Sequence, residues 1–249
     1  MKATQLNEAM GYIDDKYLDM AEAPKKEIME MATKRNRKTI GKVLLVAAMV
    51  MMLAITAYAT DFMNVKTLCS GASKTYKSYE KMDQAMQEAG FRMDVTETFQ
   101  NGYAFESVRV EDTHALDEYG KKVFSYRELS VQYRNAQGQR LVLIGHEDLE
   151  EIPQTDSPIA QSMRIGETTV NYTLDHYKLV PEDYTPTEED KAWMELPGNH
   201  ISYGAEKVEE TDVAFLTWTK DGISYIILDP KAAQKPETLF AMAEKLIHS

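Results

Sequence analysis

The sequence predicts an α+β protein: a mainly antiparallel sheet with packed helices, preceded by one transmembrane helix and a short N-terminal amphipathic helix. Hydrophobic residues make up 43% and charged residues 27% of the 249 residues, which is ordinary globular composition. The segment 43–59 is a run of 17 residues in which only Thr56 is polar. Strand-like segments separated by tight-turn sequences follow one another from residue 92 to residue 228.

Charge and cysteine content exclude several classes of protein. The formal net charge is −12, and a chain without a basic stripe is repelled by phosphate backbones. Direct binding of nucleic acid is therefore not expected. The single cysteine, Cys69, cannot form an internal disulfide or supply the thiolates of a structural zinc or iron-sulfur site. We accordingly expect no metal and no cofactor.

The first element is an amphipathic helix near the N-terminus. Its apolar side chains recur at spacings of three and four residues, and acidic side chains lie on the other face. A helix of this length is marginal alone in water, so its apolar side should bind a partner. Seven residues are expected to contact the partner, and we name them together the N-terminal seam: Leu6, Met10, Ile13, Tyr17 and Met20 on the apolar side, with Asp14 and Asp15 from the acidic face.

The partner of the N-terminal seam is expected to be a protein. The acidic face disfavours an anionic lipid surface, because interfacial helices are usually basic there. A groove on a cytoplasmic protein is the preferred partner, and self-association into a homodimer is the alternative. Pro24 ends the helix, and a basic stretch follows it.

The second element is the apolar segment 43–59, which predicts a transmembrane helix. At ~1.5 Å per residue it spans roughly 26 Å, close to the ~30 Å of a bilayer's hydrocarbon core. Seven Lys and Arg residues between positions 25 and 42, against two Glu, orient the N-terminus toward the cytoplasm. The protein is then a single-pass protein of the cell membrane with an extracytoplasmic C-terminal domain.

A cleaved signal peptide is the competing interpretation of the same segment. Ala57-Tyr58-Ala59 is a pattern that signal peptidase accepts, and a cut after Ala59 would release a secreted domain. The 42 residues ahead of the apolar run exceed the leader of an ordinary signal peptide and favour retention. The expected parts are a cytoplasmic segment 1–42, a membrane helix 43–59, a stem 60–75 and an extracytoplasmic domain 76–249.

The domain begins with a predicted helix, 76–90, which ends at Gly90. A hairpin is predicted next, because Asn101-Gly102 suits a type I′ turn between two strand-like segments. Three further hairpins and an acidic, Pro-rich loop follow. The strands of the four hairpins are 92–100 with 103–111, 125–134 with 139–145, 162–165 with 168–179, and 213–218 with 223–228, and the loop is 181–197.

A C-terminal helix completes the predicted domain. Pro236 is at a helix-starting position, and apolar residues at helical spacing point inward: Leu239, Phe240, Ala243, Leu246 and Ile247. Sequential hairpins with terminal helices predict an antiparallel sheet covered by helix on one face.

The sequence contains no catalytic motif, and we expect that the protein is not an enzyme. The five His residues have no spacing that would place two imidazoles on one helical face for zinc. They are expected at the surface or at strand edges, with His176 partly buried because it shares strand parity with Val170 and Tyr172. The acidic runs 147–151 and 182–190 lack the spacing of a calcium loop, so solvated acidic loops are expected there.

Several motifs resemble a known family. Gly11-Tyr12-Ile13-Asp14-Asp15-Lys16-Tyr17, followed by Ala21-Glu22-Ala23-Pro24, a basic stretch and one apolar span, resembles single-pass membrane proteins of clostridial Firmicutes with anti-sigma-factor-like architecture. Phe99-Gln100-Asn101-Gly102-Tyr103 and the segments 177–184, 188–191, 202–204 and 218–225 resemble the C-terminal domain of unknown function numbered 4367.

The resemblance implies a regulator that binds an extracytoplasmic-function sigma factor in the cytoplasm and senses an envelope signal outside. The chain lacks the His-Cys-Cys zinc-binding pattern of the commonest anti-sigma domains, so the resemblance assigns sigma-factor binding to the N-terminal seam. The alternative is an anchored or secreted binding or scaffold protein of the envelope, without a sigma-factor role. A minor third alternative is an exported hydrolase on an uncommon scaffold.

Overall fold

The computed structural model describes residues 67–116, 122–149, 157–181 and 183–249, with side chains from residue 74 onward. All of them belong to the compact unit that follows residue 47. The N-terminal seam, the apolar segment 43–59 and the first part of the predicted stem lie outside the described residues. Of the helices in the described ranges, none has the length and apolar character needed to cross a membrane.

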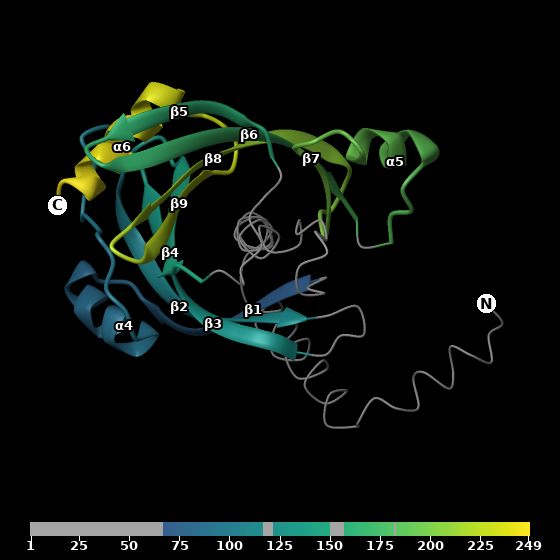
Figure 1. The fold of residues 1–249 in the computed structure, drawn as a ribbon. Coiled ribbons are helices and arrows are strands. Elements are labelled where there is room, and N and C mark those ends of the chain that lie inside the picture. The colour runs from purple at the N-terminus through teal and green to yellow at the C-terminus, as the bar shows by residue number, and fades with distance from the viewer. Residues whose placement is uncertain (1–66, 117–121, 150–156, 182) are drawn as a thin grey trace, which may run out of the picture. The chain divides into compact units, whose positions relative to one another are not determined.

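One sheet of nine strands organises the described residues (Figure 1). Its order is β1-β2-β3-β4-β9-β8-β6-β5, and β7 lies beside β6 in parallel, whereas all other pairs are antiparallel. The prediction of an α+β domain with a mainly antiparallel sheet is confirmed. The strands are β1 (Thr67–Tyr76), β2 (Ala104–Leu116), β3 (Lys122–Arg134), β4 (Arg140–Glu147), β5 (Ile159–Ile165), β6 (Thr168–Val180), β7 (Asn199–Tyr203), β8 (Glu209–Lys220) and β9 (Ile223–Asp229).

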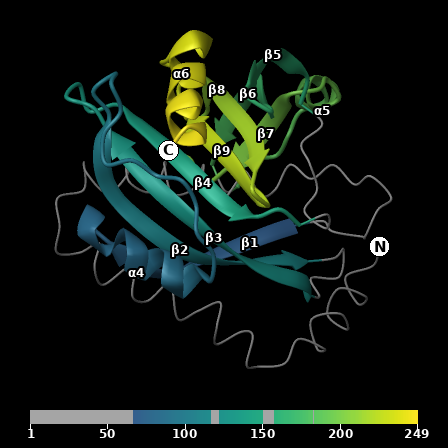
Figure 2. The ribbon, with the colours of Figure 1, turned by 60° about the vertical axis from the view of Figure 1, so that its left-hand side comes forward.

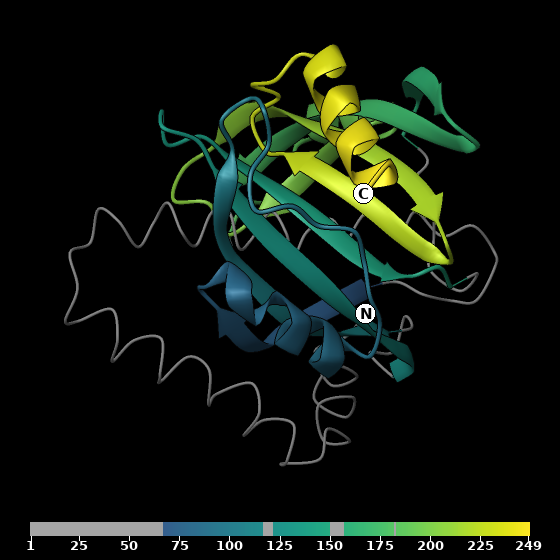
Figure 3. The ribbon, with the colours of Figure 1, turned by 90° about the vertical axis from the view of Figure 1, so that its left-hand side faces the viewer.

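Two helices pack on the sheet, and a third lies beside its β7 edge. Helix α4 (Met82–Ala89) follows a 3-10 turn, η1 (Tyr79–Lys81), and contacts β2 and β3 (Figure 2). Helix α5 (Glu188–Met194) contacts β7. Helix α6 (Pro236–Ile247) contacts β5, β6 and β8, and Figure 3 shows α4 and α6 on the same side of the sheet.

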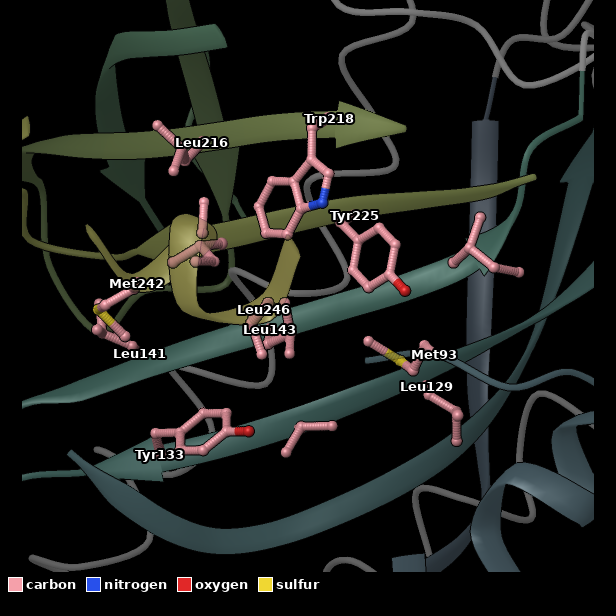
Figure 4. Close-up of a cluster of buried hydrophobic side chains, with 14 of the residues drawn as sticks. Met93, Leu129, Tyr133, Leu141, Leu143, Leu216, Trp218, Tyr225, Met242 and Leu246 are labelled. Carbon is pink, nitrogen blue, oxygen red and sulfur yellow. The ribbon is translucent and has the colours of Figure 1, made fainter. Parts of the chain in front are cut away.

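The main core lies between the sheet and the two helices α4 and α6. Helix α6 has Pro236 in its first turn and buries Leu239, Phe240, Ala243 and Leu246 as predicted, with Ile247 partly buried. In the sheet, Trp218 of β8 stacks on Tyr225 of β9 with ring centroids 5.0 Å apart (Figure 4). Leucines of β3, β4 and β8 and methionines of the loop and α6 complete the cluster in the same view.

Three of the four predicted hairpins are present: β3 with β4, β5 with β6, and β8 with β9. The β8–β9 turn is a two-residue turn in which Asp221 and Gly222 have φ angles of 52° and 75°. Such a turn needs two residues that tolerate positive φ, and its twist matches that of the flanking strands.

The hairpin predicted around Asn101-Gly102 is wrong in its first strand. A turn does form there, and the Gly102 N–H donates to the Phe99 carbonyl at 3.0 Å. It is not the predicted type I′ turn, because Gly102 has positive φ and Asn101 does not. The bridge between Thr98 and Ala104 is the only strand pairing of the segment before the turn among the described residues. The segment before the turn is a loop that crosses the core face. Met93 in this loop approaches Gly145 of β4 so closely that a Cβ at residue 145 would lie 2.6 Å from the Met93 sulfur.

Three elements are present where the sequence predicted none: β1, α5 and β7, the strand that pairs in parallel with β6. Strand β1 lies within the segment 60–75 that was expected to be a stem, and it pairs with β2. Helix α5 lies within the stretch 181–197 that was expected to be a loop. It begins at a capping box in which Thr187 and Asp190 each bond the other's backbone N–H.

Candidate functional site

Polar side chains cross strands β2, β3 and β4 on the face opposite α4 and α6. The strand register places Glu111 opposite Glu128 and Glu128 opposite His146, and paired residues share a face. These three side chains are buried, with exposed fractions of 2%, 8% and 7%. We name the whole set the buried polar row: Arg109, Glu111, Thr113, Glu128, Ser130 and His146.

Glu111 and Glu128 face each other, but of the two only Glu111 forms an ion pair with a described residue. Arg109 forms an ion pair with Glu111, with Nη2 2.6 Å from Oε1. Burial and, to a smaller extent, the Glu111 charge raise the pKa of Glu128 to about 8, although the Arg109 charge opposes both. Glu128 therefore holds its proton at neutral pH, whereas Glu111 is paired with a cation. Two carboxyl groups whose environments differ in this way can play different roles in one site.

His146 extends the row onto β4 as a neutral ring. Its Nδ1 lies 2.7 Å from the Glu147 carbonyl oxygen, and because that oxygen only accepts, Nδ1 carries the proton. Burial lowers the pKa of His146, although the Glu147 carbonyl and the Asp148 charge oppose this. The Nε2 atom of the neutral ring is thus an acceptor. The ring of Tyr126 packs against it with centroids 5.3 Å apart.

Ser130 Oγ and Arg109 Nε are among the buried polar atoms of the row that form no hydrogen bond within the described residues. A buried donor or acceptor without a hydrogen bond costs about 1–3 kcal/mol, so native proteins contain few of them. Together with the facing carboxyl groups, these atoms distinguish the row from an ordinary sheet interior. The buried polar row is the candidate functional site of the domain.

A second polar cluster contains the residue types of a serine hydrolase but not their order. Ser157 Oγ donates to Asp175 Oδ2 at 2.8 Å, and His200 Nε2 lies 3.2 Å from the same oxygen. In a catalytic triad the His lies between Ser and Asp, so that it can take the serine's proton. Here the carboxylate lies between the two others. The cluster joins β7 and the residues before β5 to β6.

The structure corrects three predictions about polar residues. His146 and His200 were expected at the surface or at strand edges, yet each is 7% exposed. His146 lies on β4 between β3 and β9, and His200 on β7 is covered by the Tyr177 ring at 4.9 Å between centroids. His176 was expected to be partly buried, but it is exposed and its Nδ1 lies 2.6 Å from the Asp212 carboxylate. Asp190, expected in a solvated loop, is buried and accepts from Tyr184 at 2.7 Å.

Sequence reasoning also missed the site itself. In β3, Leu129, Val131 and Tyr133 alternate with Glu128 and Ser130, a pattern that indicates one apolar face and one polar face. It contains no signal for whether the polar face is solvated. The seven residues of the N-terminal seam, which were the predicted site, lie outside the described residues.

Within the described ranges, no three His, Cys, Asp or Glu side chains gather closely enough to hold a metal ion. Comparison with protein-family models, with curated proteins and with solved structures finds no match to this chain.

Proposed function

We propose that the protein is a single-pass membrane regulator of the anti-sigma-factor type. In this proposal the N-terminal seam binds a sigma factor in the cytoplasm, and the C-terminal domain responds to a signal in the envelope. The observation that supports it best is the buried polar row, because it places the carboxyl groups of Glu111 and Glu128 opposite each other inside the sheet, where a change of charge or a bound cation would alter their repulsion. Burying charged or titratable groups costs several kcal/mol per group, and apolar replacements are often more stable.

The position of the row suggests how a signal would reach the membrane segment. Glu111 lies opposite Ala72 of β1, and the β1–β2 pairing shifts between Ala72 and Lys74. Such irregularities in strand pairing occur frequently beside functional sites. Strand β1 is the first described element after the apolar segment 43–59. In this proposal, a change in charge or ligation at Glu111 and Glu128 acts on β1, which follows the proposed membrane segment in the sequence.

Partner binding is tested by affinity capture of the full-length protein from detergent-solubilised membranes. The matched variant carries Met10→Asp, Ile13→Asp and Tyr17→Asp, which places charge on the apolar side of the N-terminal seam. We expect a sigma factor with the wild type and its loss from the variant. Deletion of residues 1–24 should likewise release the partner and raise expression of its target genes. Equal capture by both proteins would contradict the proposal.

Membrane orientation is tested by thiol labelling, because the chain has only one cysteine. In a Cys69→Ser background, Glu206→Cys adds a thiol at an exposed position of the domain, and Ala3→Cys adds one near the N-terminus. A membrane-impermeant maleimide should label residue 206 in intact cells and residue 3 only after permeabilisation. Labelling of residue 3 in intact cells would exclude the proposed orientation.

A secreted envelope-binding protein is the second candidate function. Ala57-Tyr58-Ala59 favours it, because cleavage there would remove both the apolar segment and the N-terminal seam. N-terminal sequencing of the mature protein decides between the two functions. A mature chain that begins at Thr60 supports the secreted protein, and one that retains the N-terminal seam supports the regulator.

A further inference from the structure

A groove lies between α4, the loop that contains Met93, and the β8–β9 turn. Its volume is about 520 Å³, and it is distinct from the buried polar row, which lies on the other face of the sheet. The floor is formed by side chains that belong to the main core: Met82, Met86, Met93 and Tyr225. Figure 4 shows Met93 and Tyr225 in the same buried cluster. Thioether side chains are unbranched and polarisable, so this buried floor can repack slightly when a ligand lies over it.

The wall of the groove is held in place by hydrogen bonds. The Asp94 N–H donates to the Tyr225 hydroxyl at 2.9 Å, and Lys220 Nζ donates to Asp94 Oδ2 at 2.6 Å. Lys220 also donates to the Ile247 carbonyl at 2.9 Å, which joins the same loop to the end of α6. Burial raises the pKa of Tyr225 to about 12, so its hydroxyl stays neutral. The groove is therefore formed before any ligand binds, which lowers the entropic cost of binding.

The rim of the groove is acidic. Four carboxylates line it, those of Glu80, Asp83, Asp94 and Asp221, against a single basic side chain, Arg92. Arg92 is already paired with Asp83 at 2.7 Å, and Asp94 is paired with Lys220. Glu80 and Asp221 are exposed and form no ion pair with any described residue. We name this feature the acidic groove.

We propose that the acidic groove binds a basic peptide segment of another molecule. Its Lys or Arg head groups would pair with Glu80 and Asp221. Their aliphatic stems and neighbouring apolar side chains would pack on Tyr79 and Val95, which line the groove and are only partly buried. This inference rests on the proposed function. In that orientation the chain's own basic stretch, residues 25–42, lies on the other side of the membrane and cannot fill the groove.

The test measures binding of a fluorescent, amidated peptide with Lys and Leu at helical spacing, using full-length protein in a non-ionic detergent. The groove variant is Glu80→Gln with Asp221→Asn, because Asn tolerates the positive φ of residue 221 and keeps the turn. The matched control, Glu167→Gln with Glu206→Gln, removes two exposed acidic charges elsewhere. The same peptide with Glu in place of Lys serves as the anionic probe.

We expect the groove variant to bind the Lys–Leu peptide about fivefold more weakly than the wild type. The control variant should bind as the wild type does, the Glu–Leu peptide should not bind, and added salt should weaken wild-type binding. Equal binding by the groove variant and the wild type, or equal weakening by both variants, would overturn the proposal. Neither result changes the expected capture of a sigma factor by the N-terminal seam. A negative result for peptide binding to the acidic groove is therefore distinguishable from a negative result for the proposed function.

Discussion

Glu128 and Asp190 are both buried carboxyl groups of the same domain, with exposed fractions of 8% and 4%. Their pKa values move in opposite directions. Burial raises the pKa of Glu128 to about 8. Hydrogen bonds from Lys178 and Tyr184, with further ones from Thr187, hold the pKa of Asp190 far below its usual range. The number of donors around a buried carboxyl group, and not its burial alone, decides whether it is charged.

The difference separates a structural carboxylate from a responsive one. Asp190 connects α5 to β6 through Lys178 and caps the first turn of its own helix. Glu128 has the Glu111 carboxylate opposite it, and the nearest cation, Arg109, is already paired with Glu111. A proton on Glu128 is thus held by burial and by repulsion, which a change of pH or a bound cation can reverse. This contrast is the basis for assigning the buried polar row to signal response.

The largest expected effect comes from removing the cation of the row. Arg109→Met leaves the Glu111 carboxylate buried beside Glu128 without an ion pair, and breaking a buried pair in this way typically costs about 3–5 kcal/mol. Urea unfolding followed by tryptophan fluorescence measures the loss. The double variant Arg109→Met with Glu111→Leu should recover most of it. A single variant as stable as the wild type would show that Glu111 is not held by this pair.

A slightly smaller effect is expected from Glu128, and it depends on pH. Its pKa is raised on folding, so the native state binds the proton more tightly, and this stabilisation is complete below about pH 4.5 and disappears as the pH rises through about 8. Glu111 and Arg109 on β2 and His146 on β4 also face the Glu128 carboxyl group and can contribute to the pH dependence of stability. Comparison of the wild type with Glu128→Gln isolates the contribution of Glu128. Between pH 5 and pH 8 the wild type should lose about 3 kcal/mol relative to the variant. Parallel stability curves for the two proteins would contradict the assignment.

Asp190→Asn should show the opposite dependence on pH. The pKa of Asp190 is lowered on folding, so its contribution is present above its unfolded value of 3.8 and disappears as the pH falls below it. We expect the variant to melt several degrees lower than the wild type at neutral pH, with the gap closing in acid. Thermal unfolding followed by circular dichroism at neutral and acid pH checks this. A gap that widens in acid would mean that the Lys178 pairing does not stabilise the fold.

The smallest effects are expected from removing one hydroxyl group in the Asp190 capping box and one in the buried polar row. Thr187 accepts from the Asp190 N–H at 3.1 Å, so Thr187→Ala should cost about 1 kcal/mol through the lost cap. The buried Ser130 hydroxyl has no hydrogen bond within the described residues, so Ser130→Ala should be neutral or slightly stabilising. Urea midpoints of the two variants give the comparison. A loss at Ser130 equal to that at Thr187 would reveal a partner for the Ser130 hydroxyl.

Local chemistry explains why some elements could be predicted. Asp221-Gly222 and Gly166 mark tight turns, and Pro236 marks a helix start, so two hairpins and α6 follow from a few neighbouring residues. No local signal places β4 beside β9 or β6 beside β8, because these pairings join segments far apart in the chain. The segment 92–100 was predicted as a strand from the turn signal of Asn101-Gly102, but Met93 packs closely on Gly145 of β4, a non-local contact that no neighbouring residue signals.

The candidate site could be predicted only in part. Strand alternation places Glu128 and Ser130 on one face of β3, yet it does not say which side chains lie opposite them. The pairing of Glu111 with Glu128 depends on the register between β2 and β3, which shifts at both ends of the ladder. The Thr187 and Asp190 capping box was, by contrast, readable from their three-residue spacing.

The most direct test of the account is the infrared titration of the Glu128 carboxyl group. The difference spectrum between acid and alkaline pH is recorded for the wild type and for Glu128→Gln. The account predicts a protonated-carboxyl band that disappears with a midpoint near pH 8 in the wild type and is missing from the variant. A wild-type spectrum without that band at neutral pH would show that Glu128 is ionised. The buried polar row would then be an ordinary charged network.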